Sequence, residues 1–451
     1  MKVFKSLILA GLLLAYAGTA LGAVSAEEAK KLGTTLTPVG AEMAGNADGT
    51  IPPYTGGLTT PPATYKEGSN LRPDPFASEK PLFSIDAGNM EKYAGRLTEV
   101  TKALMEKYPS TYRIDVYPTH RTAAFPQYIL DDTARNAVTA ETADGGLSLK
   151  NALGGYPFPI PKDGYEVMWN HLTRYDGEAW EGVLISYNVD ANGRKTLAVD
   201  AWELNEYPYN FKKNPSDYYI RVKIRFLRPE RRAGEITMAI DPIDMVNKGR
   251  RAWQYLPGQR RVKMAPEIAF DTPNPSTSGA TTYDDSFCFC GSMERYDWKL
   301  IGKKEMYVPY NLYKLTYGST SDEICKTRGH MNPDVVRWEL HRVWVVEANL
   351  KPSMRHIYSK RVFYVDEDTW SVLFADQYDL RGQIYRGMFS LITQSYDANT
   401  PWSTAQVGHD LIAGTYTSGT TFGDGHGYLK YVKPTPDREW NPEALAGSGV
   451  R

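Results

Sequence analysis

Alternation of apolar and polar residues with a period of two dominates the second half of this chain. In the clearest segment, residues 218–227, Ile220 and Val222 alternate with the basic residues Arg221 and Lys223. Because successive side chains of a strand point to opposite faces, the pattern predicts a strand with one apolar and one basic face. Similar strands are predicted at 182–190, 195–204, 234–240, 251–256, 298–308, 337–347, 356–366, 370–378 and 383–393.

Helical spacing occurs mainly before these strands. Apolar residues three and four positions apart, including Leu97, Val100 and Leu104, predict one amphipathic helix over 86–108, and a shorter helix is predicted over 163–172. Since strands and helices do not alternate, the strands are expected to pair antiparallel. The predicted fold class is α+β, with a large curved antiparallel sheet wrapped over one or two helices.

The first 23 residues have the composition of a secretory signal peptide. Lys2 and Lys5 precede an apolar run at 7–17, and small residues follow as far as Ala23. A run of about 11 residues is too short to cross a bilayer of about 30 Å as a helix. We therefore expect cleavage near Ala23 and, in a bacterium with two membranes, a periplasmic protein. No Cys follows the run, so a lipid anchor is not expected.

Composition divides the rest of the chain into three parts. Residues 24–85 are rich in Pro, Gly and Thr. They show neither the period of a strand nor the spacing of a helix, which predicts an extended N-terminal arm. Residues 86–396 hold the predicted helices and strands and are expected to form the main domain. Residues 397–451 contain Gly- and Pro-rich stretches and are expected to be an irregular tail.

Overall composition excludes several classes of protein. The chain of 451 residues carries 52 Lys and Arg against 53 Asp and Glu, which gives no basis for nucleic-acid binding. Three Cys are too few for a disulfide framework, although Cys325 could pair with Cys288 or Cys290. The motifs of serine hydrolases, zinc proteases and nucleotide-binding loops are absent from the sequence, and we predict neither metal nor cofactor.

Histidine provides the only candidates for catalysis. Alternation places Arg337, Glu339 and His341 on one face of a predicted strand, where the carboxylate could orient the imidazole as a general base. The alternative is a polar network on a solvated sheet face. His120 beside Arg121 is a similar case.

A basic segment interrupts the neutral chain at 221–263. Its paired arginines Arg231, Arg232, Arg260 and Arg261 could contact anionic head groups or an acidic partner protein, or they could simply lie on a solvated strand face.

Aromatic residues are concentrated in the predicted strands. If the concave side of the sheet is left empty, these rings could line an apolar cavity, and otherwise they form the core. The candidates for ligand binding are Trp169, Trp202, Trp253, Tyr255, Trp298, Trp338 and Trp344.

Several strings resemble a family of exported proteobacterial proteins of unknown function, over about residues 35–395. They include DVYPTHR at 115–121, PFPIP at 157–161, AWQYLPGQRRV at 252–262, RYDWKLIGKKEMY at 295–307 and RWELHRVWVVE at 337–347. That family is similar to the lipoprotein-sorting proteins LolA and LolB, which implies that residues 86–396 form a lipoprotein-carrier-like domain. The resemblance implies a half-open antiparallel barrel over helices, with an apolar cavity for acyl chains. It also implies an association with transporters of the resistance-nodulation-division type.

These observations favour a non-enzymatic periplasmic carrier or accessory protein. Its expected ligand is a hydrophobic lipid, acyl or sterol-like molecule, and its expected partner is a resistance-nodulation-division transporter or an outer-membrane protein. Two alternatives remain open. One is a hydrolytic enzyme for a hydrophobic ester, with Glu339 and His341 or His120 in its site. The other is a structural component of a transport complex that holds no ligand.

Overall fold

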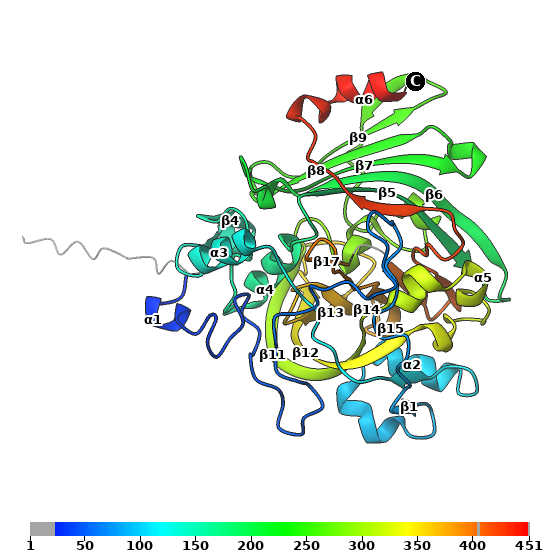
Figure 1. Ribbon diagram of the computed structural model, residues 1–451. Helices are drawn as coiled ribbons and strands as arrows, with labels where there is room; N and C mark the ends of the chain where they lie inside the picture. Colours follow the sequence, from blue (N-terminus) through cyan, green and yellow to red (C-terminus); the bar gives the residue numbers. More distant parts are fainter. Residues whose placement is uncertain (1–22, 404–405, 450–451) are drawn as a thin grey trace, which may run out of the picture.

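The computed structural model describes residues 23–403 and 406–449 (Figure 1). The predicted signal peptide, apart from its last residue, lies outside these ranges. Within them, no helix is both long enough and apolar enough to cross a membrane.

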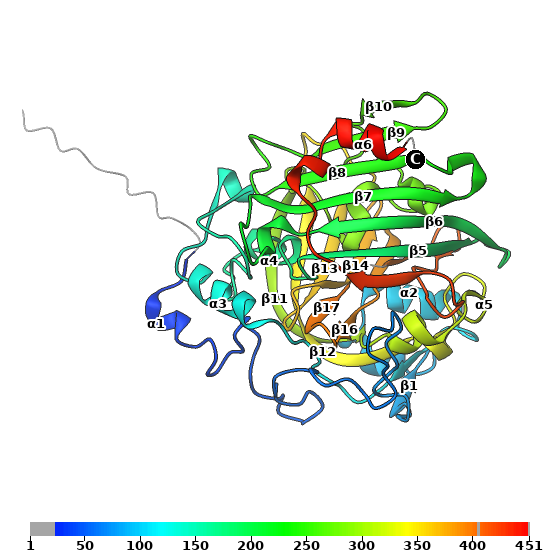
Figure 2. The ribbon, with the colours of Figure 1, turned by 45° about the horizontal axis from the view of Figure 1, so that its top comes forward.

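The first wall of the sheet is an antiparallel series of strands that follow one another in the chain. In Figure 2 these strands lie side by side as the green layer. They are β5 (Ala179–Val189), β6 (Lys195–Glu206), β7 (Tyr218–Arg228), β8 (Ile236–Pro242), β9 (Arg251–Leu256) and β10 (Arg261–Met264).

The second wall, yellow to orange in the same figure, is also antiparallel. It consists of β11 (Tyr296–Pro309), β12 (Arg337–Leu350), β13 (Lys360–Asp366), β14 (Val372–Tyr378) and β15 (Ile384–Ser390). Two short strands connect β15 to β5, namely β18 (Gln406–Asp410) and β19 (Thr415–Thr417). Among the described residues β10 and β11 do not pair, so the sheet is curved but not closed.

The predicted sheet is confirmed. The strands of both walls match the segments of period-two alternation to within a few residues, except for the short edge strand β10, which the pattern did not reveal. All pairings within the two walls are antiparallel, while β12 pairs in parallel with β2 (Ile114–Val116).

The helix predicted over 86–108 is wrong as a single element. The structure has a 3-10 helix, η1 (Met90–Arg96), and then α2 (Glu99–Lys107), with Leu97 in an extended conformation between them. The break arises because the Thr98 hydroxyl accepts the N–H of Thr101 and thereby caps α2. The Asp376 carboxylate also accepts the N–H groups of Glu99 and Val100, which fixes the start of α2 on the sheet.

The shorter predicted helix is confirmed as α4 (Gly164–Leu172), which packs on β11. A Cβ atom at Gly164 would lie 2.9 Å from the backbone of Trp298, so glycine permits this close approach. The other α-helices and strands before residue 396 are α1 (Ala26–Ala29), α3 (Gln127–Asn136), α5 (Ser321–Ile324), β1 (Phe83–Ile85), β3 (Glu141–Ala143), β4 (Ser148–Lys150) and β16 (Thr393–Ser395).

The C-terminal segment differs from its prediction. Residues 397–449 were expected to be irregular, but they contain β17 (Thr400–Trp402), β18, β19, β20 (Tyr428–Tyr431) and α6 (Pro442–Gly449). Helix α6 covers the outer face of the first wall, where Trp440 and Leu445 pack against residues of β8 and β9 (Figure 1). The strands are only three to five residues long, which is too short for an alternation pattern to identify them.

Residues 265–295, which connect β10 to β11, enter the concave side of the sheet. We call this segment the plug. It contains two 3-10 helices, η5 (Pro275–Thr277) and η6 (Tyr283–Cys288), that contact β5 and β6 on one side and β14 and β15 on the other. The space that the sheet encloses is therefore largely filled by the chain itself.

Candidate functional site

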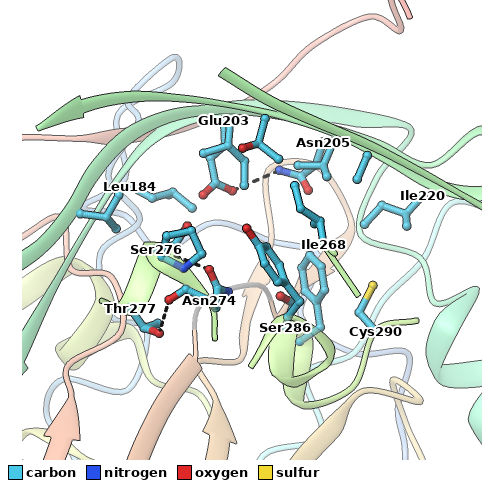
Figure 3. Close-up of a pocket in the computed structure, with 18 of the residues that line it drawn as sticks. Leu184, Glu203, Asn205, Ile220, Ile268, Asn274, Ser276, Thr277, Ser286 and Cys290 are labelled. Atoms are coloured by element: carbon cyan, nitrogen blue, oxygen red, sulfur yellow. Dashed lines mark hydrogen bonds between the residues drawn. The ribbon is translucent and has the colours of Figure 1, made fainter. Parts of the chain in front are cut away.

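A cavity of about 170 Å³ remains between the plug and the inner face of β5–β8 (Figure 3). Its walls are mainly apolar. The strands contribute Leu184, Ile220, Val222, Ile224 and Phe226, and the plug contributes Ile268 and Phe287.

Strand alternation decides which side chains reach this cavity. On β6, Glu203 and Asn205 point inward, as Figure 3 shows, while Trp202 and Leu204 lie in the apolar cluster beneath α6. On β7, Ile220 lines the cavity, whereas the basic residues between the apolar ones face outward. The guanidinium of Arg221 lies 4.7 Å and the amine of Lys223 lies 4.5 Å from the Trp440 ring centroid.

Glu203 and Asn205 are the polar groups that β6 places in the cavity. The Asn205 amide nitrogen donates to Glu203 Oε2 over 3.4 Å, while Asn205 Oδ1 is buried and accepts no hydrogen bond. Burial raises the pKa of the Glu203 carboxyl to about 7, and the hydrogen bond from Asn205 offsets only part of that rise.

Arg250 and Asp241 line the other end of the cavity and form an ion pair with no net charge. Arg250 donates to both carboxylate oxygens of Asp241, over 2.7 and 3.0 Å. It also donates to the carbonyl oxygens of Ile268 and Cys290, so it ties both ends of the plug to β8 and β9.

A buried ion network anchors the plug to the second wall. Arg361 of β13 donates to Asp284 over 3.1 Å and to Asp285 over 2.8 Å, and all three side chains are buried. Burial alone would raise the pKa of Asp284, but Arg361 and a hydrogen bond from His356 hold it well below its ordinary value. The Tyr358 hydroxyl and the Gln377 amide also donate to Asp285.

None of the seven aromatic residues proposed from the sequence is among the residues that line the cavity. Trp169, Trp298 and Trp338 are buried in the main core. Trp344 stacks on Trp370 with ring centroids 6.1 Å apart. The other three, Trp202, Trp253 and Tyr255, belong to the cluster beneath α6. In the described chain these rings pack against neighbouring side chains.

The paired arginines gather at one end of the first wall. Arg231 and Arg232 lie in the β7–β8 connection, and Arg260 and Arg261 lie at the β9–β10 turn. The two connections are neighbours because β8 pairs with β9. Arg232 pairs with Glu235 over 2.9 Å and lies over the Phe226 ring. The other three are exposed, and no ion pair to them is found in the described part of the chain.

The predicted grouping of Arg337, Glu339 and His341 on one face of β12 is confirmed. The Glu339 carboxylate accepts from Arg337 Nε over 2.5 Å and lies 3.0 Å from His341 Nε2. It also accepts the backbone N–H of His120 and the amide of Asn311. The expected solvated face is wrong, because Glu339 and His341 are buried. The His120 ring lies outside this group and pairs with Glu79 over 2.7 Å.

All seven histidines fall within the described residues, and none of them lines the cavity. The enzymatic alternative therefore has no histidine at this site.

One group of side chains has the spacing of metal ligands. His341, Asp366 and Asp368 offer ligand atoms that lie within 4.8 Å of one another. All three are buried, and Asp368 already accepts two hydrogen bonds from Arg121. Asp366 accepts hydrogen bonds from Tyr310 and Thr369, and His341 pairs with Glu339, so we describe this group as part of the core.

The disulfide considered for Cys325 is wrong. All three Cys are free and buried. Burial raises the pKa of the thiols, to about 12 for Cys288 and Cys325 and to about 11 for Cys290. The Cys288 thiol lies 3.4 Å from the Ser390 hydroxyl, which places it within the protein core.

Replacing Glu203 with glutamine should change how stability depends on pH. The pKa of Glu203 rises from 4.5 to about 7 on folding, so ionisation favours the unfolded state as the pH increases through this window. The stability gained by Glu203→Gln should therefore grow between pH 4.5 and pH 8, by about 3 kcal/mol. Urea unfolding at several pH values measures it. Glu181→Gln on the neighbouring strand should show no such growth, and a pH-independent difference for Glu203→Gln would contradict the prediction.

The geometry defines a class of protein: an open antiparallel half-barrel whose concave side holds a segment of its own chain and one small apolar cavity. The chain belongs to the family described as "Protein of unknown function (DUF1329)", which matches residues 84–446. An uncharacterized protein of Pseudomonas aeruginosa strain PAO1 is 42% identical over 458 residues, covering 100% of both chains. The sequence resemblance to an uncharacterised family is thus confirmed.

The solved structures that match this chain have low sequence identity to it. A DUF1329 family protein from Desulfovibrio piger is 17% identical, with 59% of this chain and 91% of that chain covered and a TM-score of 0.40. A putative outer membrane lipoprotein-sorting protein domain from Vibrio parahaemolyticus is 14% identical. The match covers 63% of this chain and 98% of that chain, with a TM-score of 0.43. A LolA superfamily protein from Nitrosomonas europaea is 11% identical. The match covers 63% of this chain and 100% of that chain, with a TM-score of 0.37.

Proposed function

We propose that this protein is a non-enzymatic carrier of a small hydrophobic molecule, and that the cavity between the plug and β5–β8 is its binding site. The observation that carries the proposal is the cavity itself, which is mainly apolar and lies on the concave side of the sheet. Removal of apolar surface from water stabilises such a complex by about 25 cal/mol per Å².

The size of the cavity limits what it holds in this conformation. A cavity of about 150 Å³ lined by aliphatic and aromatic residues accepts a molecule as large as benzene. The 170 Å³ available here suits one ring or a short acyl segment. A longer lipid requires the plug to move away from β5–β8.

The location and partner belong to the same proposal. The composition of residues 1–23 supports export to the periplasm. There a resistance-nodulation-division transporter or an outer-membrane protein would load and unload the ligand. The exposed Arg231, Arg260 and Arg261 offer a basic surface for an acidic partner or for lipid head groups.

Filling the cavity should strongly reduce ligand binding. Ala239 lines the cavity from β8, and Ala239→Leu adds three carbon atoms to the space. Protein purified from the periplasm of its own bacterium should carry an apolar compound in native mass spectrometry, and Ala239→Leu should reduce the occupied fraction at least about tenfold because the two groups compete for one volume.

The matched control is Ala233→Leu, which adds the same atoms at an exposed turn and should leave occupancy unchanged. An empty wild-type protein, or equal occupancy in wild type and Ala239→Leu, would contradict the proposal. Thermal unfolding of both variants shows whether they are folded.

A further inference from the structure

The polar groups of the cavity are arranged to recognise a particular kind of ligand. Glu203 and Asn205 are two residues apart on β6, so both side chains point from one strand toward the plug (Figure 3). Below them in the figure lie Asn274 and Ser276 of the plug. The Asn274 side chain is occupied, because its Oδ1 accepts the N–H of Ser276. On the strand side of the cavity, Glu203 and Asn205 therefore keep hydrogen-bonding capacity, and the hydroxyls of Tyr283 and Ser286 line the cavity from the plug.

Asn205 has an unused acceptor at this position. Its Oδ1 atom is buried and has no hydrogen-bond partner in the protein, and the residue itself has no exposed surface. An unsatisfied buried acceptor costs about 1–3 kcal/mol. A ligand that donates one hydrogen bond to Oδ1 would recover that free energy.

Glu203 supplies the complementary group. Within the described residues, its carboxyl forms one hydrogen bond, which it accepts from Asn205 over 3.4 Å. Burial raises its pKa to about 7, so below neutral pH the carboxyl is protonated and can donate a hydrogen bond. One side of the ligand's polar group thus meets a donor and the other side meets an acceptor.

The charges around the cavity disfavour an anionic ligand. The one cation among the lining residues, Arg250, is already engaged by both oxygens of Asp241. A carboxylate or phosphate in the cavity would lack a free counter-ion and would face Glu203, and burial of an unpaired charge is strongly unfavourable.

We propose that the cavity binds a neutral apolar compound bearing a hydroxyl group, which donates to Asn205 Oδ1 and accepts from the Glu203 carboxyl. The inference rests on the proposed carrier function and narrows its ligand to the class of apolar alcohols. A hydroxyl group has one donor and accepting lone pairs, and so satisfies both residues at once.

The test compares four probes that share one six-membered ring: cyclohexanol, methylcyclohexane, cyclohexanecarboxylate and cyclohexylamine. Binding to the full-length protein at pH 6 is measured by saturation-transfer NMR and competition. We expect cyclohexanol to bind most tightly. In Glu203→Leu its affinity should fall about tenfold, the effect of one hydrogen bond of about 1–1.5 kcal/mol, while methylcyclohexane binds at least as well as before.

Two further variants separate recognition from folding. Glu203→Gln retains a donor and should keep the preference for cyclohexanol. Glu181→Leu removes a carboxylate from the neighbouring strand β5 outside the cavity and should change none of the four affinities.

The outcomes distinguish this inference from the carrier proposal. The alcohol class would be overturned if the carboxylate or the amine bound more tightly than cyclohexanol, or if Glu203→Leu bound cyclohexanol as tightly as wild type. In either case, binding of methylcyclohexane would still support a carrier. Failure of the wild-type protein to bind any of the four probes would overturn both.

Discussion

Replacing Arg361 with methionine should lower the free energy of unfolding by about 3–5 kcal/mol, the range measured when one partner of a buried ion pair is removed. Arg361 is completely buried and donates to Asp284 and Asp285, which hold the plug on the second wall. Without the guanidinium, two carboxylates remain in the core with fewer donors. Urea unfolding measures the loss, and hydrogen exchange of residues 265–295 should increase with it.

A triple variant provides the control for this prediction. Combining Arg361→Met with Asp284→Asn and Asp285→Asn removes the uncompensated charges, so it should recover a large part of the lost stability. A second comparison is Arg386→Met, because Arg386 pairs with the single carboxylate of Asp410 and is less buried. Its effect should be smaller. A loss below about 1 kcal/mol for Arg361→Met would show that the network does not hold the plug.

Replacing Glu339 with alanine should have an effect of similar size, about 3–5 kcal/mol. The Glu339 carboxylate accepts hydrogen bonds from Arg337, Asn311 and the backbone of His120, and it lies beside His341. All of these donors would lose their acceptor in a buried place, where water cannot replace it. Chemical denaturation at pH 7 measures the change.

The pH dependence of this variant follows from the pKa of Glu339. Burial acts to raise that pKa, but His341 and Arg337 outweigh it, and the pKa lies below its ordinary value of 4.5. The ionised carboxylate therefore contributes stability above about pH 4.5, and the contribution is lost as the pH falls through the folded-state pKa. The difference between wild type and Glu339→Ala should shrink in acid.

The control on the same strand is Glu347→Ala. Glu347 is partly exposed and its carboxylate accepts from Asn349, so its removal should cost less than about 1 kcal/mol at any pH. Equal effects of the two variants would contradict a special role for the buried network. A Glu339→Ala protein as stable as wild type would do the same.

Sequence alternation predicted the strands of both walls but could not tell which face of a strand meets the cavity. On β6, Trp202 and Leu204 alternate with Glu203 and Asn205, and apolarity favoured the tryptophan face as the inner one. The structure reverses this, because α6 covers the tryptophan face from outside. Alternation shows that a strand has two different faces. Which element covers each face depends on segments that are distant in the chain, such as α6.

The same limit applies to β12 and to the plug. Alternation correctly placed Arg337, Glu339 and His341 together, but their burial depends on the arm and on β2, which come from distant parts of the sequence. The plug has no long periodic segment, since its regular elements are two short 3-10 helices. Its position inside the sheet follows from Arg361 and Arg250, whose partners could not be inferred from the sequence alone.

The order of strands in the sheet has a consequence for how the chain folds. Each wall consists of neighbouring hairpins, which close over short stretches of sequence. The walls are joined only when β19, near the end of the chain, pairs with β5, through Tyr416 opposite Val189 and Thr417 opposite Asn188. Contacts between such distant residues slow folding because loop entropy is lost before they form. We therefore expect two early hairpin assemblies and a late, rate-limiting closure by the C-terminal strands.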